Sequence, residues 1–368
     1  MTTSATAAIA YKAGSPLALE PVELAELQAN EILVNVQACG ICHTDTKFQQ
    51  VLTLPGVFGH EGTGTVEEVG AGVSDIQPGD RVIMSYPFCN HCSPCLEAEP
   101  YKCEDIFALK FGGQRLDGSK TISLNGKGIS SSFFQQSSFA TKAICLEQAA
   151  VKIDSSLPPE MLAALPCGIQ TGAGAVLNSF KVKPAEGVVI FGAGAVGLSA
   201  VMAARLCSAN PIICIDMNET RLQLAKELGA THLFNAAEEE LIRLVHEVAP
   251  RGVQYAFDSS ASVPGLKNAI SCIGQGGQVG IVSYPLGGDE FPFTTKDLFL
   301  KVGSLHGIFQ GSSVPRLFLP KLIALQESGE FPYEKLITTY NFSDINQAFE
   351  DTHSGGVIKP VLLMNECR

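Results

Sequence analysis

The sequence predicts an α/β protein with two parts, an antiparallel barrel-like β-domain and a doubly wound domain built on a parallel sheet. Up to about residue 168 the chain is rich in Gly, Pro, Thr and Val. It contains short alternating stretches there, such as 31–37 and 63–69, that are typical of antiparallel strands. After about residue 170, strand-like and helix-like segments alternate, which indicates right-handed crossovers in a parallel sheet covered on both faces. The expected domains are 1–168, 169–309 and 310–368, the last returning to the first.

Hydrophobic patterning predicts the elements of the second part. The expected strands are 188–191, 212–215, 232–235, 255–258 and 279–282, and the expected helices are 196–206, 219–228 and 237–248. The last sixty residues predict a helix near 315–328 and a final strand near 360–364. The most apolar stretch, 188–204, is interrupted by glycines, so it is better explained as a strand, a turn and a helix than as a membrane span.

Composition excludes several classes of partner. The net charge is −12, with 25 Lys and Arg against 37 Asp and Glu, and no basic cluster is present. We therefore expect no nucleic acid and no membrane partner, because phosphate contacts need clustered cations. The N-terminal residues lack the basic and apolar regions of a signal peptide, so we expect a cytoplasmic protein. Twelve cysteines in such a chain indicate metal binding more than disulfides.

Four cysteines lie close together in a loop at 89–103. Cys89, Cys92, Cys95 and Cys103 have the spacing C-x2-C-x2-C-x7-C. Four thiolates can close a tetrahedral shell around zinc and leave no open position, which predicts a structural zinc. Two alternatives stay open from spacing alone, an iron–sulfur cluster and unligated cysteines.

A glycine-rich motif predicts a dinucleotide site. Gly192, Gly194 and Gly197 form a G-x-G-x-x-G that follows an expected strand and opens an expected helix, with Val196 at its start. Such a turn lets backbone N–H groups approach a pyrophosphate, as in Rossmann domains. Asp216 ends the next strand, where a carboxylate accepts from both ribose hydroxyls and repels a 2′-phosphate, so NAD is favoured over NADP. The alternative for Asp216 is an ordinary helix N-cap.

Two further motifs carry a family resemblance. The stretch 59–73 (GHEGTGTVEEVGAGV) and the segment 39–45 (CGICHTD) precede the four-cysteine loop. In that order they resemble the zinc-containing medium-chain alcohol dehydrogenases, over essentially the whole chain. The segment 170–178 (QTGAGAVLN) is most similar to the aryl-alcohol (benzyl-alcohol) branch of that family. The resemblance implies a GroES-like catalytic domain, a Rossmann domain and two zinc ions per subunit.

The resemblance also implies the site residues. Cys42, His60 and Cys167 would hold a catalytic zinc with an open fourth position, although spacing alone would not join them. Thr44 would pass on the substrate proton, Asp45 would orient a ligand, and Glu61 would lie beside the metal. The implied cofactor contacts, besides the glycine-rich motif and Asp216, are His43, Arg221 and Lys359. For Lys359 the alternative is a solvated surface lysine.

Two positions differ from the pattern of some relatives. Relatives with a full proton relay have a histidine where this chain has Lys47, so the resemblance assigns no end to the relay in this chain. Ser85 falls where some relatives have a bulkier Phe, which implies room for a large substrate.

These observations predict an NAD-dependent zinc enzyme that interconverts a primary, bulky alcohol, such as an aryl or allylic one, with its aldehyde. The alternatives are a glutathione-linked formaldehyde dehydrogenase, a secondary-alcohol or polyol dehydrogenase, and a non-enzymatic use of the fold. By family analogy we expect a homodimer, with a homotetramer as the alternative.

Overall fold

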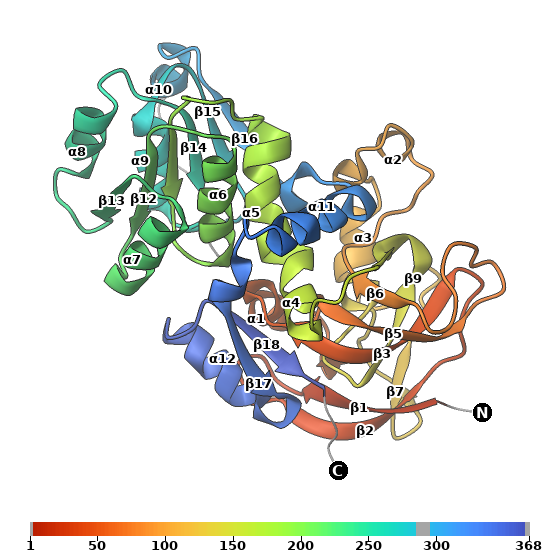
Figure 1. Cartoon of the computed structure of the whole chain (residues 1–368). Coiled ribbons are helices and arrows are strands. Elements are labelled where there is room, and N and C mark those ends of the chain that lie inside the picture. The colour runs from red at the N-terminus through yellow and green to blue at the C-terminus, as the bar shows by residue number, and fades with distance from the viewer. Residues whose placement is uncertain (1–2, 285–294, 365–368) are drawn as a thin grey trace. The chain divides into compact units, whose positions relative to one another are not determined.

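The structure is a computed structural model that describes residues 3–284 and 295–364. Its internal contacts divide the chain into two units, shown in Figure 1. Unit 1 comprises Met1–Cys167, Val314–Ile323 and Glu334–Arg368, and unit 2 comprises Gly168–Ser313 and Ala324–Tyr333. The domain limits inferred from the sequence stay a prediction.

Unit 1 is built on two largely antiparallel sheets. The five-stranded sheet has the order β4-β1-β2-β7-β8, and the seven-stranded sheet has the order β10-β6-β5-β3-β18-β17 with β9 also paired to β3. The strands are β1 (Thr3–Ala10), β2 (Ala18–Leu24), β3 (Glu31–Gly40), β4 (Gly56–Val57), β5 (Gly62–Val69), β6 (Arg81–Met84), β7 (Ile122–Leu124), β8 (Lys127–Gly128), β9 (Lys142–Leu146), β10 (Ala150–Lys152), β17 (Ile337–Asn341) and β18 (Lys359–Leu363). The helices are α1 (His43–Gln49), α2 (Ser93–Leu96), α3 (Ile106–Phe111), α4 (Pro159–Ala164), α12 (Ile345–His353) and α11 (Pro315–Glu327), which crosses the unit limit.

The alternating stretches of the sequence form the centre of this unit. Residues 31–37 lie in β3 and residues 63–69 lie in β5, as predicted, and the two strands pair antiparallel. The register shifts twice along this pair, between Leu33 and Val34 and between Val36 and Ala38. Such bulges bend a strand and re-aim side chains near its end. The candidate ligand Cys42 follows the carboxyl end of β3 in the chain, and the candidate ligand His60 precedes the start of β5.

Unit 2 is a parallel sheet with helices between its strands. The strand order is β13-β12-β11-β14-β15-β16, which is 3-2-1-4-5-6 when counted within the unit, the doubly wound dinucleotide-binding order. The strands are β11 (Val188–Phe191), β12 (Ile212–Asp216), β13 (His232–Asn235), β14 (Val253–Asp258), β15 (Ile273–Ile281) and β16 (Ser304–Gly307). The helices are α5 (Gln170–Gly174), α6 (Ala195–Leu206), α7 (Glu219–Leu228), α8 (Leu241–Val248), α9 (Val263–Cys272) and α10 (Thr295–Phe299).

Local signals explain why several elements match their predicted limits. Helix α7 begins after Asn218, whose side chain accepts from the Arg221 N–H, and ends at Gly229, which has a φ of 123°. A polar N-cap and a glycine that tolerates positive φ are the usual ends of a helix. Strand β11 is fully buried and α6 follows it, so the apolar stretch 188–204 is a strand, a turn and a helix. Across residues 3–284 and 295–364, no helix is long and apolar enough to cross a membrane.

Three predictions of secondary structure need correction. The helix predicted at 237–248 begins only at Leu241, because the Ala237 N–H bonds to the Asn235 side chain and the chain turns first. The strand predicted at 279–282 begins earlier, at Ile273. The sequence did not indicate this start, because the first residues of the strand are glycine-rich and show no alternation of apolar and polar residues. No helix was predicted around Cys167, yet α4 continues through a π-helical turn, Leu165–Ile169, into α5 and a second π-helical turn, Ala175–Phe180.

Candidate active site and metal centres

Helix α1 and its N-cap position Cys42, Thr44 and Asp45, three of the four predicted site residues found there. Cys42 is its N-cap, with an extended backbone, and Thr44 and Asp45 lie in its first turn. The Asp45 carboxylate accepts from the Cys42 backbone N–H at 2.9 Å, which completes a capping interaction and fixes Cys42 at the start of the helix. The thiol therefore projects from a rigid, capped helix end.

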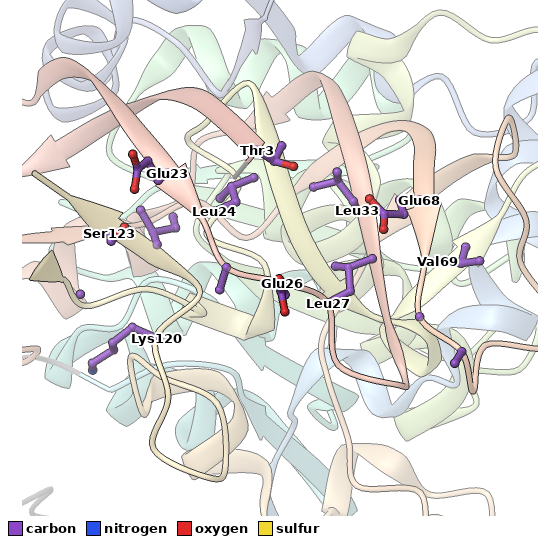
Figure 2. A pocket seen from close by; sticks show the side chains of 15 residues that line it. Thr3, Glu23, Leu24, Glu26, Leu27, Leu33, Glu68, Val69, Lys120 and Ser123 are labelled. Carbon is purple, nitrogen blue, oxygen red and sulfur yellow. The ribbon is translucent and has the colours of Figure 1, made fainter. Parts of the chain in front are cut away.

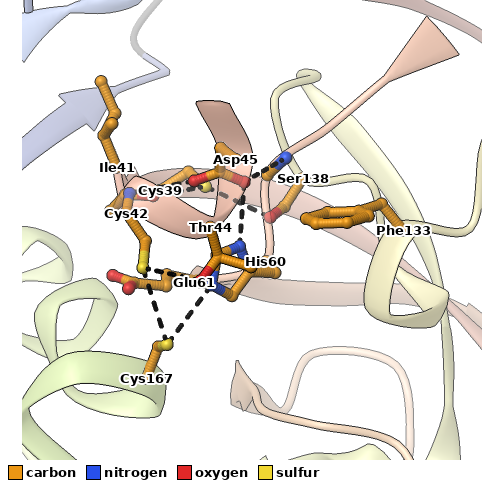
Figure 3. A network of polar contacts seen from close by, with 12 residues as sticks. Cys39, Ile41, Cys42, Thr44, Asp45, His60, Glu61, Phe133, Ser138 and Cys167 are labelled. Carbon is orange, nitrogen blue, oxygen red and sulfur yellow. Dashed lines mark hydrogen bonds and ion pairs between the residues drawn. The ribbon is translucent and has the colours of Figure 1, made fainter. Parts of the chain in front are cut away.

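Three distant candidate ligands converge within unit 1, as Figure 3 shows. The Sγ atoms of Cys42 and Cys167 are 3.9 Å apart, and Nε2 of His60 is 3.3 Å from Cys167 Sγ. A tetrahedral zinc with metal–sulfur bonds of about 2.3 Å needs sulfurs about 3.8 Å apart. The geometry therefore fits one ion. Cys167 reaches this point from the π-helical turn, a feature often found at functional sites.

Glu61 adds a fourth potential ligand, a carboxylate, to the two thiols and the imidazole of the same cluster. The potential ligand atoms of Cys42, His60, Glu61 and Cys167 all lie within 4.8 Å of one another. Glu61 is fully buried, and its Oε1 has no hydrogen-bond partner among the described residues. An orphaned carboxylate oxygen beside two thiols and an imidazole fits a site made for a cation.

Asp45 holds the imidazole of His60 in one orientation. Its Oδ1 lies 2.9 Å from His60 Nδ1 and also accepts from the Gly59 N–H at 3.1 Å. A proton on Nδ1 leaves Nε2 to face the two thiols, which is the arrangement that metal-binding histidines use. The structure thus places Asp45 where the family resemblance implies an orienting residue.

The electrostatics of the cluster favour charged ligands. Burial alone lowers the pKa of His60, but the Asp45 carboxylate outweighs it, and the pKa rises to about 10. The hydrogen bond with Cys167 holds the pKa of Cys42 well below the usual thiol value, while the same contact raises that of Cys167. A bound metal would displace the His60 Nε2 proton, because only the neutral imidazole ligates.

Lys359 is not the solvated surface lysine of the alternative reading. It begins β18, is 2% exposed, forms an ion pair with Glu61 and donates to the Ile41 carbonyl at 3.3 Å. Burial raises the pKa of Glu61 to about 7, although the Lys359 ammonium opposes this shift. The ammonium is therefore held beside the ligand cluster in unit 1.

Thr44, His43 and Lys47 of α1 are less buried than Asp45. Thr44 Oγ1 lies 3.5 Å from Cys42 Sγ, so its hydroxyl is beside the ligand cluster. The side chain of His43 is exposed at the first position of the helix. Lys47 is half-buried, and burial lowers its pKa. A lysine with a lowered pKa is a better proton acceptor than a solvated one.

The four-cysteine loop forms a second, closed donor set. The ligand atoms of Cys89, Cys92, Cys95 and Cys103 all lie within 4.8 Å of one another. Backbone N–H groups of Cys89 and Cys92 point at the sulfurs of Cys103 and Cys89, each at 3.3 Å. This compact separation suits a single tetrahedral ion, whereas a multi-iron cluster would need wider spacing between the sulfurs.

The glycine-rich loop of unit 2 has the shape that a pyrophosphate needs. Gly192 has a φ of 95°, and a Cβ on Gly197 would collide with the Gly192 carbonyl. A Cβ on Gly194 would meet nothing within 4 Å, so backbone there faces open space beside the N-terminus of α6. Val196 lies in the first turn of that helix. These roles are the ones expected of the three glycines in a dinucleotide site.

Asp216 is not a helix N-cap, because Asn218 caps α7. One oxygen of Asp216 accepts from the Ala193 N–H at 2.6 Å, and the other accepts from the Asn218 N–H at 2.8 Å. The carboxylate is thereby fixed at the end of β12, next to the glycine-rich loop. Arg221 is half-buried in the first turn of α7.

Sequence reasoning missed the loop that covers His60. The Phe134 ring stacks on the His60 imidazole with centroids 4.2 Å apart. Gln136 is 2% exposed and bonds to the backbone on both sides of Glu61, accepting from Gly62 N and donating to the His60 carbonyl, each at 3.1 Å. Phe134 has a φ of 52°, which is uncommon for a bulky residue and invisible in a hydrophobicity pattern.

A separate pocket opens elsewhere in unit 1 (Figure 2). It has a volume of about 670 Å³ and includes Glu23, Glu26, Glu68 and Lys120 in its lining. None of the site residues predicted from the sequence lines it.

Two known protein families match large parts of this chain. Residues 28–154 match the family described as alcohol dehydrogenase GroES-like domain, and residues 195–326 match the family described as zinc-binding dehydrogenase. The chain is 41% identical over 364 residues to geraniol dehydrogenase from Castellaniella defragrans, covering 98% of each chain.

Two solved structures are similar over nearly the full chain. An alcohol dehydrogenase zinc-binding domain protein from Burkholderia ambifaria is 41% identical, with a TM-score of 0.97 and coverage of 100% of both chains. Benzyl alcohol dehydrogenase from Acinetobacter calcoaceticus is 38% identical, with a TM-score of 0.94 and coverage of 98% of this chain and 99% of that one.

Proposed function

The chain belongs to the zinc-dependent medium-chain alcohol dehydrogenases and is an NAD-dependent enzyme, and we propose that it interconverts primary aryl or allylic alcohols and their aldehydes. The observation that carries this proposal is the convergence of Cys42, His60 and Cys167: Cys167 Sγ lies 3.9 Å from Cys42 Sγ and 3.3 Å from His60 Nε2. Two thiolates and one imidazole leave the fourth zinc position open for substrate, as in other catalytic zinc sites.

Two kinds of observation support the substrate class. Among the similar proteins, one is named geraniol dehydrogenase and another benzyl alcohol dehydrogenase, and both cover almost the whole chain. Two aromatic rings contact His60: Phe134 stacks on the imidazole, and Phe133 lies edge-on with the ring centroids 5.5 Å apart. Ser85 is fully buried, and the family resemblance places it where some relatives have a bulkier Phe. Flat, π-rich alcohols suit such surroundings.

The residues of this chain would share the work as follows. Zinc, when bound by Cys42, His60 and Cys167, acts as a Lewis acid toward the alcohol oxygen. Thr44 would accept the proton of the alcohol hydroxyl and pass it toward solvent, and bound NAD would supply the acceptor for the hydride of the carbinol carbon, which leaves an aldehyde. Asp45 keeps His60 in the ligating orientation. Gly194, Asp216 and the N-terminus of α6 hold the dinucleotide.

The finer features of the assembly belong to the same proposal. We place the enzyme in the cytoplasm, and its described cysteines form no disulfide, which suits a reducing compartment. We also propose a homodimer joined through β16, one of the two edge strands of the six-stranded sheet. Phe299 and Val302, which precede that strand, are 79% and 77% exposed. Exposed apolar side chains beside an unpaired sheet edge are typical of an interface with another chain. Sedimentation of the purified enzyme tests this against a tetramer.

Turnover on a panel of alcohols, combined with one ligand variant, tests the central proposal. The wild-type enzyme should oxidise benzylic and allylic alcohols with at least tenfold higher kcat/KM than ethanol. Cys42→Ala should abolish turnover and reduce bound zinc from two ions to one per chain. Cys207→Ala, which alters a half-buried cysteine outside both donor sets, is the matched control. Full activity in Cys42→Ala, or a preference for short aliphatic alcohols, would overturn the proposal.

A further inference from the structure

Lys110 is a buried lysine beside the ligand cluster that has no role in the chemistry described so far. It lies in α3 and is 1% exposed. Its ammonium is 4.3 Å from the centroid of the Phe134 ring, and 5.6 Å and 5.7 Å from those of Phe111 and Tyr86. Three aromatic rings thus surround the charge, and ring faces attract cations.

The same rings connect Lys110 to the metal ligands. Phe134, the nearest ring, stacks on the imidazole of His60. The thiolates of Cys42 and Cys167 are close enough that their charges raise the pKa of Lys110, although burial lowers it more and brings it to about 7. Those two thiolates are titratable groups whose charges act on the lysine, and the imidazole of His60 stacks on the Phe134 ring that the ammonium contacts.

Burying an ammonium has a cost that a neutral side chain would avoid. Cation–π contacts with the three rings recover part of that cost. A methionine would fill the same space between rings with no such penalty. Buried groups with perturbed pKa values beside a cluster of ligands are therefore candidates for function.

We propose that Lys110 is a charge-setting residue of the dehydrogenase, whose caged ammonium makes the Cys42–His60–Cys167 site favour an anionic oxygen ligand. The inference rests on the proposed function, since that ligand is the substrate oxygen after loss of its proton. Two thiolates neutralise the charge of a divalent zinc ion, so an additional cation in a poorly solvated region changes the potential at the open position. The coupling is reciprocal: an anion at the site also favours the protonated lysine.

A matched pair of ligands separates charge from shape. Benzoate carries a negative charge, and benzamide has almost the same shape without it. Both would be titrated calorimetrically into zinc-loaded enzyme with saturating NADH, for the wild type, Lys110→Met and Lys110→Arg. We expect Lys110→Met to weaken benzoate binding about tenfold and to leave benzamide binding within twofold of the wild type. Lys110→Arg, which keeps the charge, should retain the preference for benzoate.

The pH dependence gives a second readout. In the wild type, benzoate affinity should fall more steeply than in Lys110→Arg as the pH rises and the lysine loses its proton. Equal weakening of both ligands in Lys110→Met would mean that Lys110 only supports packing, and unchanged benzoate binding would mean that its charge is not felt at the site. Either result overturns the inference.

Two checks keep the test decisive. Bound zinc is counted in every variant, and Lys110→Gln replaces Lys110→Met if the latter loses zinc. Oxidation of benzyl alcohol by the wild type is measured in the same preparation. If that turnover is absent, the proposed function fails, whereas normal turnover with no effect of the lysine charge on benzoate overturns only the role of Lys110.

Discussion

The carboxylate of Asp45 lies 2.9 Å from Nδ1 of His60, and both side chains are fully buried. The other oxygen of the same carboxylate accepts from the backbone N–H of Cys42. One side chain therefore ties together two ligands that are 18 positions apart in the sequence (42 and 60), one at the N-cap of α1 and the other just before β5. Because a ligand set must be held before the metal arrives, this contact bears on metal affinity.

Asp45→Asn should weaken binding of the catalytic zinc by about 10–100-fold, the usual effect of removing a ligand's carboxylate partner. The amide can still accept from Cys42, but it no longer stabilises a proton on His60 Nδ1. Competition with a chromophoric chelator measures the affinity of this zinc, and the four-cysteine zinc provides an internal reference. Affinity equal to that of the wild type would show that His60 does not need Asp45.

Lys110 also predicts how stability changes with pH. Burial lowers its folded-state pKa to about 7, while the unfolded chain keeps the ordinary value of about 10.4. Between these values the unfolded state binds more protons, so this lysine makes the protein less stable at pH 7 than at pH 9, by about 2 kcal/mol. Lys110→Met removes this pH-dependent contribution to the free energy of unfolding.

Urea unfolding of zinc-free protein at pH 7 and pH 9, under reducing conditions, measures this difference. The free energy of unfolding should rise with pH by about 2 kcal/mol more in the wild type than in Lys110→Met. Parallel pH profiles for the two proteins would show that Lys110 keeps a normal pKa when buried.

Much of unit 2 could be predicted because its signals are local. The Asn218 cap, the final Gly229 and the fully apolar β11 each lie within a few residues of the limit they define. The helical run around Cys167 could not be predicted, since Pro166 and Gly168 are helix breakers by composition. There the π-helical turn accommodates residues that an α-helix would reject.

The ligand set itself was only partly accessible from sequence. The spacing of the four cysteines in the loop predicts a metal site. By contrast, only the family resemblance predicts that Cys42, His60 and Cys167 share a metal. Lys110 and Gln136 had no local signal at all, because their burial depends on a loop in which Ser132, Phe134, Gln135 and Ser137 all have positive φ. Such backbone is maintained by tertiary contacts, for example the bond from Ser137 to the Val57 carbonyl.

The four-cysteine loop should depend on its metal for its fold. Its helix α2 spans only Ser93–Leu96, so little besides the sulfurs holds it together. Cys103→Ala should reduce bound zinc to one ion per chain and lower Tm, while the remaining zinc keeps its affinity. Cys207→Ala is again the control for cysteine loss alone. A variant that keeps two zinc ions would show that the loop does not bind metal.

Asp216 should determine the choice of dinucleotide. Its two oxygens are fixed by the N–H groups of Ala193 and Asn218, so the negative charge stays at the end of β12 instead of swinging away. A 2′-phosphate placed there would be repelled, and a ribose hydroxyl would be accepted. Asp216→Gly should lower the ratio of kcat/KM for NAD over NADP by about 10–100-fold, since it removes both the repulsion and the acceptor. Asp216→Asn separates these two effects, because it removes the charge and keeps one acceptor. Steady-state kinetics with both cofactors measures the ratio, and a ratio unchanged in both variants would assign the discrimination to another residue.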